Sequence, residues 1–213
     1  MPKKEVPLDF LSRYLPTGTD QQVLDLLQRH RVQLTITRER RTLLGDYRHR
    51  THSQQHRITV NGNLNPYAFL VTLLHELAHL LTFEQFGNRV QAHGKEWKNC
   101  YAKLLESFLS LDLLPNPLHK ALQEMLVNPS ASSCAEDGLM RVLRQYDPPK
   151  ENHFFLEELP AGAQFRIKDG RIFRKEALLR KRIKCKELKT GNYYLFSPVY
   201  EVEKVIGLEG LLD

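Results

Sequence analysis

The segment from Tyr67 to Phe86 is the feature that most constrains the fold, because apolar residues lie on nearly every face of a helix there. Asn65 and Pro66 precede the segment; asparagine is a favoured N-cap, and proline is tolerated at the first helical position. Gly87 follows the segment and favours a left-handed C-terminal cap. A helix that is apolar all round is buried, so the segment is predicted to be the central helix of a core.

Two histidines and a glutamate interrupt this apolar segment in the pattern HExxH, formed by His75, Glu76 and His79. Histidines four residues apart share one helix face, and their neutral imidazoles can bind one Zn²⁺ ion at about 2.0–2.1 Å. Zinc lowers the pKa of a bound water toward ~7, and the glutamate of this motif accepts its proton and delivers it to the leaving amine. Chance is the alternative, but polar side chains are costly to bury without partners. The motif predicts a zinc-dependent hydrolase with Glu76 as general base.

A catalytic zinc site needs a third protein ligand and an open position. The extended motif HExxHxxGxxH is absent, because Thr82 and Gln85 stand where its glycine and third histidine would be. His93 is the preferred third ligand, because it follows a glycine-containing loop and directly precedes a helix. Glu96 is the alternative, although acidic residues also favour a helix N-terminus for electrostatic reasons.

The other histidines and aromatic residues carry weaker signals. A solvated basic loop is favoured over metal binding for the segment 47–57, which holds His49, His52 and His56. Ordinary surface positions are expected for His30, His119 and His153. Trp97 is interpreted as a core anchor under the site and not as a substrate contact. The side chain that stabilises the oxyanion stays open among Tyr47, Tyr67 and Tyr101.

Patterns around the central helix indicate both helices and strands. Alternating apolar residues predict strands over 32–36, 43–47 and 56–60, and helical spacing predicts helices from Thr19 onward, over 95–109 and over 118–127. Residues 128–152 include two stretches rich in turn residues and are predicted to be a linker. Short apolar runs broken by glycine and proline predict a small antiparallel β module over 153–213. The chain is therefore predicted to be α+β, with its first domain over 1–127.

Positive charge is concentrated in the predicted β module. The whole chain has a net charge of +6 and a pI of about 9.2, whereas residues 165–189 hold eleven basic against three acidic side chains. Clustered bases can follow a phosphate backbone, and aromatic rings can stack on exposed nucleobases; a solvated strand face is the alternative. The candidate nucleic-acid-binding residues are Arg171, Arg174, Lys175, Arg180, Lys181, Arg182 and Lys184. Single- or double-stranded DNA is the expected partner, bound mainly through phosphates.

The cysteines and the hydropathy pattern bear on the compartment. Cys100, Cys134 and Cys185 lie far apart and form no CxxC, which argues against a disulfide framework and against a complete cysteine zinc ribbon. We find no apolar stretch of the roughly 20 residues that a membrane span needs. The start of the sequence lacks the apolar segment of a secretory signal, so a cytoplasmic protein without a membrane partner is expected.

The sequence resembles the SprT-like metalloprotease family over about residues 20–110. The resemblance rests on the segments 44–48, 58–61, 73–79 and 93–98, which read LGDYR, ITVN, LLHELAH and HGKEWK. It implies a minimal zincin, in which a small sheet packs on the HExxH helix and a following helix. It also implies that His75, His79 and His93 are the zinc ligands and that Glu76 is catalytic.

The same resemblance implies a setting for the activity. Better-studied members of the family cut proteins that are bound or crosslinked to DNA, and the DNA serves as scaffold and activator. Many bacterial members carry a four-cysteine zinc ribbon after the protease domain, but only Cys185 stands in that region here. The β module is therefore interpreted as a ribbon-like fold that has lost its metal.

Two main hypotheses follow from the sequence. The first is a zinc peptidase that acts on protein substrates, including proteins attached to DNA. The second is a zinc-stabilised nucleic-acid-binding protein without catalytic turnover. The presence of Glu76 favours the enzyme, because a purely structural zinc site has no use for a base there. Hydrolysis of a non-protein bond by the same chemistry is a third hypothesis.

Overall fold

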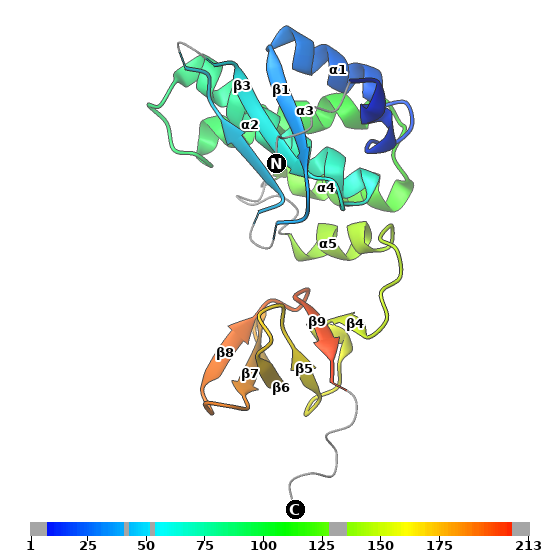
Figure 1. Cartoon of the computed structure of the whole chain (residues 1–213), viewed down its shortest axis with the longest axis vertical. Helices are drawn as coiled ribbons and strands as arrows, with labels where there is room; N and C mark the ends of the chain where they lie inside the picture. The colour runs from blue at the N-terminus through cyan, green and yellow to red at the C-terminus, as the bar shows by residue number, and fades with distance from the viewer. Residues whose placement is uncertain (1–7, 41–42, 52–53, 128–135, 206–213) are drawn as a thin grey trace, which may run out of the picture. The chain divides into compact units, whose positions relative to one another are not determined.

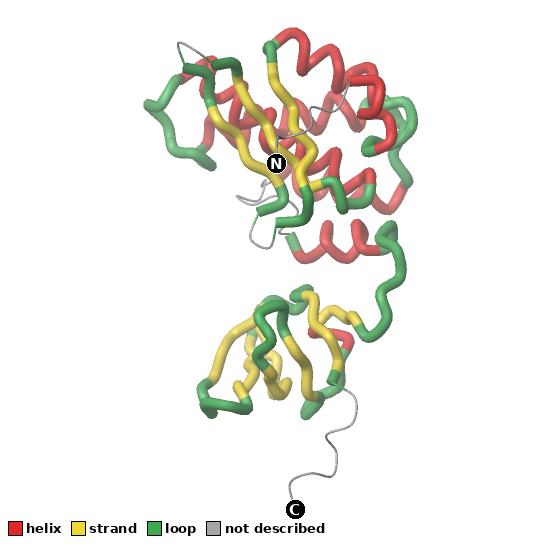
Figure 2. The backbone as a smooth tube through the Cα atoms, in the orientation of Figure 1, coloured by secondary structure: helices red, strands yellow, loops and turns green. Residues whose placement is uncertain are grey.

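The computed structural model describes residues 8–40, 43–51, 54–127 and 136–205. The chain divides into two compact units, residues 1–147 and 148–213. Together they contain helices, a small mixed sheet and a second, antiparallel sheet (Figures 1 and 2), so the predicted α+β class is confirmed. His52 and Cys134 lie outside the described residues.

The sheet of the first unit has three strands in the order β1-β3-β2. The central strand β3 pairs in parallel with β1 and antiparallel with β2. These strands span β1 (Val32–Thr37), β2 (Gly45–Arg48) and β3 (His56–Asn61). β2 is therefore an edge strand in this sheet, and it begins two residues later than the sequence predicts.

The helices of the first unit pack around this sheet and around one another. They are η1 (Leu8–Arg13), α1 (Asp20–Arg29), α2 (Pro66–Phe86), α3 (Lys95–Leu109), α4 (Asn116–Val127) and α5 (Asp137–Arg144). α2 contacts β2, β3 and α3, while α4 contacts α3 and α5. The large buried side chains include Phe69 and Leu73 of α2, Trp97 and Phe108 of α3, and Ile58 of β3.

The N-cap of α2 and the place where the helix ends are as predicted. Asn65 Oδ1 accepts a hydrogen bond from the Ala68 backbone N–H at 2.9 Å, and Gly87 ends the helix with a positive φ of 62°. The ψ of Gly87 is −143°, so its conformation is not the left-handed helical one that was predicted. The membrane prediction needs a correction, because α2 is long and apolar enough to span a bilayer by length and composition alone. However, 72% of its apolar window is buried inside the fold, as expected for the core helix of a soluble domain. The cytoplasmic location stays a prediction.

Helix α5 lies inside the segment 128–152 that was predicted to be a linker. Leu139 and Leu143 of this helix are buried in the core of the first unit. Asn65 Nδ2 donates to Leu143 O at 3.0 Å and to Asp147 Oδ1 at 2.6 Å. The first unit therefore extends to Asp147, because a short amphipathic helix there is stabilised by tertiary packing and not by its own length.

The second unit is a six-stranded antiparallel sheet in the order β4-β9-β5-β6-β7-β8. Its core holds Phe165, Phe173, Ile183 and Cys185. Burial raises the pKa of the Cys185 thiol to about 11, so this thiol packs as an apolar core group. The elements are β4 (His153–Phe155), η2 (Leu156–Glu158), β5 (Gln164–Arg166), β6 (Ile172–Leu179), β7 (Arg182–Glu187), β8 (Tyr193–Phe196) and β9 (Glu201–Lys204).

Candidate metal centre

Three histidine side chains converge beside α2. His75 and His79 share one face of the helix, and His93 approaches them from the loop between α2 and α3. The Nε2 atom of His75 lies 3.3 Å from Nε2 of His79 and 3.3 Å from Nε2 of His93. The three ligand atoms all lie within 4.8 Å of one another. Among the described residues this is the one group of histidine, cysteine or carboxylate side chains that meets the geometry of a metal site.

The donor chemistry of this cluster fits a transition metal. Nitrogen ligands at about 2.0–2.1 Å from a tetrahedral zinc ion lie roughly 3.3–3.4 Å apart, which agrees with the two measured separations. Burial, and then His79 and His93, lower the pKa of His75 to about 3. Burial, and then His93, lower the pKa of His79 to about 4, and burial lowers that of His93. All three imidazoles are therefore neutral at pH 7, which is the form that binds a metal ion.

Trp97 forms the floor of the cluster. Its side chain is fully buried, and its ring centroid lies 4.7 Å from that of His75, 5.4 Å from that of His79 and 4.7 Å from that of His93. Tyr101 also packs against the indole ring of Trp97, with a centroid distance of 5.0 Å. Trp97 therefore holds the three imidazole rings from one side, and the prediction of a core anchor is confirmed.

Glu76 is buried next to the cluster and close to β2. Burial first, and Asp46 second, raise the pKa of this carboxyl group to about 8, while Arg40 opposes the shift. Arg40 is itself fixed to β3, since it donates to Thr59 Oγ1 at 2.9 Å and to Asn61 Oδ1 at 2.8 Å. Glu76 thus sits in a low-dielectric position between a carboxylate and a guanidinium, both supplied by the sheet side of the site.

Gly45 of β2 provides the space that Glu76 occupies. A Cβ atom at position 45 would lie 2.6 Å from Glu76 Oε1 and 2.8 Å from the Cγ2 atom of Thr72. Side-chain contacts that short are not tolerated, so a larger residue must displace the Glu76 carboxylate or the strand. Glycine is therefore needed here for close approach, although its backbone conformation is not left-handed.

Gly45→Ala is expected to lower kcat/KM for the activity proposed below by about 100-fold, because a displacement of about 1 Å is enough to misplace a catalytic group. Metal content should not change, since the three atoms nearest to the added methyl group belong to Glu76 and Thr72 and not to a histidine. Gly138→Ala is the control, because its Cβ would be in ordinary van der Waals contact with Glu136 Oε1, at 3.8 Å. A folded Gly45→Ala protein with the activity of the wild type would show that the close approach has no role.

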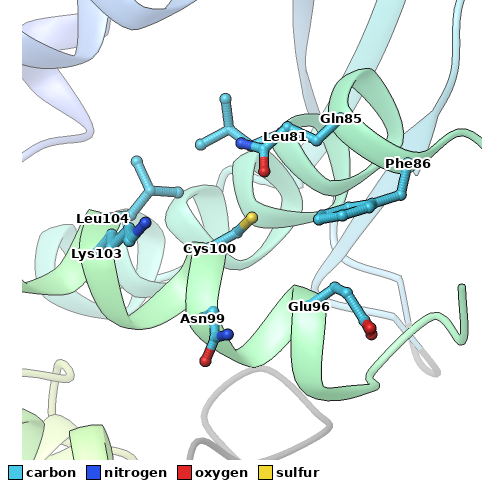
Figure 3. Close-up of a pocket in the computed structure, with 8 residues that line it drawn as sticks. All are labelled: Leu81, Gln85, Phe86, Glu96, Asn99, Cys100, Lys103 and Leu104. Atoms are coloured by element: carbon cyan, nitrogen blue, oxygen red, sulfur yellow. The ribbon is translucent and has the colours of Figure 1, made fainter.

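A pocket of about 290 Å³ lies on a different part of α2 and α3 (Figure 3). Leu81 and Phe86 line it from α2, and Cys100, Lys103 and Glu96 line it from α3. None of the three clustered histidines contributes to this pocket. Glu96, the alternative third ligand, faces this pocket and is not part of the histidine cluster, so the structure brings His93 and not Glu96 to His75 and His79.

The three tyrosines that the sequence left open have different surroundings. Tyr101 is buried, and its hydroxyl lies 3.5 Å from Val71 O. Tyr67 packs against Tyr146 at a centroid distance of 4.4 Å. The ring of Tyr47 is parallel to that of His79, at 6.5 Å between centroids and 3° between planes. Of the three, Tyr47 is the partly exposed tyrosine beside the histidine cluster.

The expectation of a solvated basic loop is wrong for His56. This residue begins β3 and is only 2% exposed. His49 stacks on Phe83 with a centroid distance of 4.5 Å. His30, expected to be an ordinary surface residue, pairs with Glu84 at 2.7 Å. His56 stands two residues before Ile58 and four before Val60, and this alternation could have indicated from the sequence that His56 is buried. The partners of His56 could not be predicted in this way, because they come from other elements.

The candidate nucleic-acid-binding residues do not all share one surface. The side chain of Lys175 packs within the second unit, where its Nζ donates to the backbone carbonyls of Glu157 and Leu159. Arg171 pairs with Asp169 at 2.8 Å, and Arg174 pairs with Glu176 at 3.3 Å. The turn between β6 and β7 carries Arg180 and Lys181, and β7 carries Arg182 and Lys184. A count of basic residues along the sequence therefore overstates the positive charge that is not paired with acidic side chains or backbone carbonyls.

The fold and this cluster define an α+β domain with a three-histidine candidate metal site on its central helix. Residues 11–115 match the model of the SprT-like family. The domain belongs to the SprT-like family, as the motifs around the central helix had suggested.

Curated relatives agree with this assignment. The chain is 37% identical over 82 residues to the Protein SprT of Shewanella oneidensis, a match that covers 37% of this chain and 48% of that protein. It is 61% identical over 31 residues to the Protein SprT of Glaesserella parasuis, covering 15% of this chain and 19% of the relative. The chain thus spans about half, or less, of the curated relatives it matches. No solved structure gives a significant match.

Proposed function

We propose that this chain is a zinc-dependent peptidase of the zincin type that hydrolyses protein substrates. The observation that carries the proposal is the convergence of three neutral imidazoles next to the buried carboxyl group of Glu76. Membership of the SprT-like family supports a metalloprotease activity. His75, His79 and His93 would hold the ion, and no protein carboxylate takes part in that donor set.

In the proposed mechanism His75, His79 and His93 would hold a zinc ion, which would supply Lewis-acid chemistry and lower the pKa of a water molecule toward neutrality. Glu76 accepts the proton of the attacking water and passes it to the leaving amine. Burial raises the pKa of this side chain to about 8 in the metal-free chain, so once it has accepted the proton it holds it more readily than an exposed carboxylate does. The positive charge of a bound ion would favour the ionised carboxylate that accepts the proton in the first half of the transfer. Gly45 keeps the carboxyl group in place, and Trp97 keeps the imidazoles in place.

Metal analysis combined with a cleavage assay tests the proposal. We expect the purified chain to contain one zinc ion and to cleave casein, and we expect a chelator to remove both the metal and the activity. Re-addition of zinc should restore the activity, because the imidazoles are already neutral and close together. A metal-free protein that cleaves casein as fast as the zinc-loaded protein would exclude the proposed mechanism.

We also propose that the second unit binds nucleic acid, which would bring the peptidase to proteins attached to DNA. Lys184 pairs with Leu195 across β7 and β8, and Lys186 pairs with Tyr193. Directly paired residues of antiparallel strands point to the same side, so these four side chains form one surface, called here the β7–β8 face. Tyr193 is 53% exposed, and Lys184 Nζ lies 3.9 Å from the centroid of its ring.

The β7–β8 face combines the two features that single strands of nucleic acid require. An exposed aromatic ring can stack on a base, and adjacent ammonium groups can contact phosphates. The candidate residues named from the sequence include Lys184 but not Lys186 or Tyr193. The register between β7 and β8, which decides that these side chains are neighbours, is not visible in the sequence. This face supports the expected DNA partner better than the basic residue Arg174 of β6 does, because Arg174 is paired with Glu176.

Replacing Tyr193 by alanine is expected to weaken binding of a labelled oligonucleotide by about 5–150-fold, the loss of one stacked base. Lys184→Gln with Lys186→Gln should lower the salt dependence of binding between about 50 and 200 mM salt. Fluorescence anisotropy with single-stranded and duplex DNA measures both effects. Lys150→Gln is the control, because Lys150 carries the same charge but pairs with Glu201 at 3.1 Å. Equal affinities of all these proteins would exclude the β7–β8 face.

A further inference from the structure

A second group of polar side chains lies beside the histidine cluster and is not used by the proposed mechanism. It consists of Tyr47 from β2, His56 from β3, Glu84 from α2 and His30 at the C-terminal end of α1. Four elements thus contribute to one connected group. Its members are joined by contacts of 2.7–3.7 Å.

His56 is the centre of this group. Its side chain is 2% exposed, and its Nδ1 atom lies 2.9 Å from the Tyr47 hydroxyl and 3.2 Å from the backbone nitrogen of Arg50. A backbone N–H can only donate, so Nδ1 of His56 must be an acceptor. The Tyr47 hydroxyl therefore donates its proton to the same nitrogen. Burial lowers the pKa of His56, which agrees with a neutral ring that accepts at Nδ1.

The other side of the His56 ring faces Glu84. Since Nδ1 accepts, the single proton of the neutral ring is on Nε2, which lies 3.7 Å from Glu84 Oε1. The second oxygen of this carboxylate lies 2.7 Å from His30 Nδ1. Glu84 is thereby placed between an imidazole of α1 and an imidazole of β3. This contact is longer than a hydrogen bond, and Nε2 has no hydrogen-bond partner among the described residues, so the carboxylate favours a proton on Nε2 through its charge alone.

Tyr47 links this group to the candidate metal centre. Its hydroxyl is held by His56, and its ring is parallel to the ring of His79 at a centroid distance of 6.5 Å. Offset parallel rings at such distances are a favourable arrangement of aromatic groups. Rotation of the Tyr47 side chain would break the contact with His56 and move the ring away from His79.

We propose that His56 is a positioning residue, which holds the ring of Tyr47 against His79 and so fixes the orientation of this metal ligand. The inference rests on the proposed function, because it assigns His79 to the zinc site. Groups behind metal ligands tune affinity by about 10–100-fold when they are changed. Glu84 acts one step further out, because its charge favours a proton on Nε2 of His56, and His30 holds Glu84.

The test is a double-mutant cycle read out by zinc affinity and by the absorption spectrum of the Co²⁺-loaded protein. His56→Leu and Tyr47→Phe should each weaken zinc binding about tenfold and change the Co²⁺ spectrum. The double variant should also lose about tenfold and not about a hundredfold, because both changes break the same contact. His56→Asn has nearly the shape of the leucine variant, but its side-chain oxygen can accept from Tyr47, so it should bind zinc nearly as the wild type does.

Three results would overturn the proposal: wild-type affinity in Tyr47→Phe, losses that multiply in the double variant, or equal losses in His56→Asn and His56→Leu. If His56→Leu does not fold, Tyr47→Phe and His56→Asn alone decide the question. Metal affinity is measured without a substrate. Failure of the wild type to cleave any protein would therefore contradict the proposed function and leave this test intact.

Discussion

Replacing Glu76 by glutamine is expected to reduce kcat for protein cleavage by about 10²–10⁴-fold, the usual contribution of a general base. Glutamine has nearly the same shape but cannot accept and return a proton. Zinc content should stay the same, because the three ligand atoms of the cluster come from histidines alone. Metal analysis and casein cleavage, both carried out on the same preparation, measure the two quantities.

Glu106→Gln is the matched control for this substitution, since Glu106 is an exposed glutamate of α3. It should leave both zinc content and cleavage as in the wild type. Equal cleavage by the wild type and Glu76→Gln would remove the case for a general base at this position. That result, together with intact oligonucleotide binding, would favour the second hypothesis, a zinc-stabilised nucleic-acid-binding protein without turnover.

His93→Ala is expected to weaken zinc binding by more than the 10–100-fold that a group behind a ligand contributes, and to abolish cleavage with it. The physical reason is that the three-histidine site loses one of its three direct bonds to the ion. His93 lies in the loop between α2 and α3 and is partly exposed, so its removal leaves the core intact. Competition with a chromogenic chelator measures the affinity.

Glu96→Gln is the control for His93→Ala, because Glu96 is the other candidate that the sequence offered for the third ligand. Its side chain lines the pocket between α2 and α3 and lies outside the cluster, so zinc affinity should not change. The opposite outcome, with loss of zinc in Glu96→Gln and retention in His93→Ala, would reverse the assignment of the third ligand.

The approach of Glu76 to Gly45 shows where prediction from sequence stops at the candidate site. HExxH places His75, Glu76 and His79 relative to one another, because all three belong to one helix with a fixed repeat. Which side chains surround them depends on the sheet that packs on that helix. Gly45 precedes Glu76 by about thirty positions in the chain, and no local pattern relates them.

The same limit explains why the surroundings of His56 and Lys175 differ from those that the sequence suggested. His56 lies in a sequence segment rich in histidine and arginine, so composition suggested solvent exposure. The pairing of β3 with both β1 and β2 makes it the central strand and buries the residue. Lys175 was counted with the free bases, but the fold of the second unit brings its ammonium group to two backbone carbonyls.

By itself the sequence determined the central helix with its N-cap and its end at Gly87, the bounds of α3, the α+β class and the local arrangement of HExxH. These features depend on periodicity and on hydrogen bonds between residues a few positions apart, which are visible in one dimension. Only the tertiary structure decided that His93 and not Glu96 joins the histidine pair, that α5 completes the first unit, and that His56 stands behind Tyr47. Each of these depends on contacts between elements distant in the chain, where packing and burial outweigh local preference.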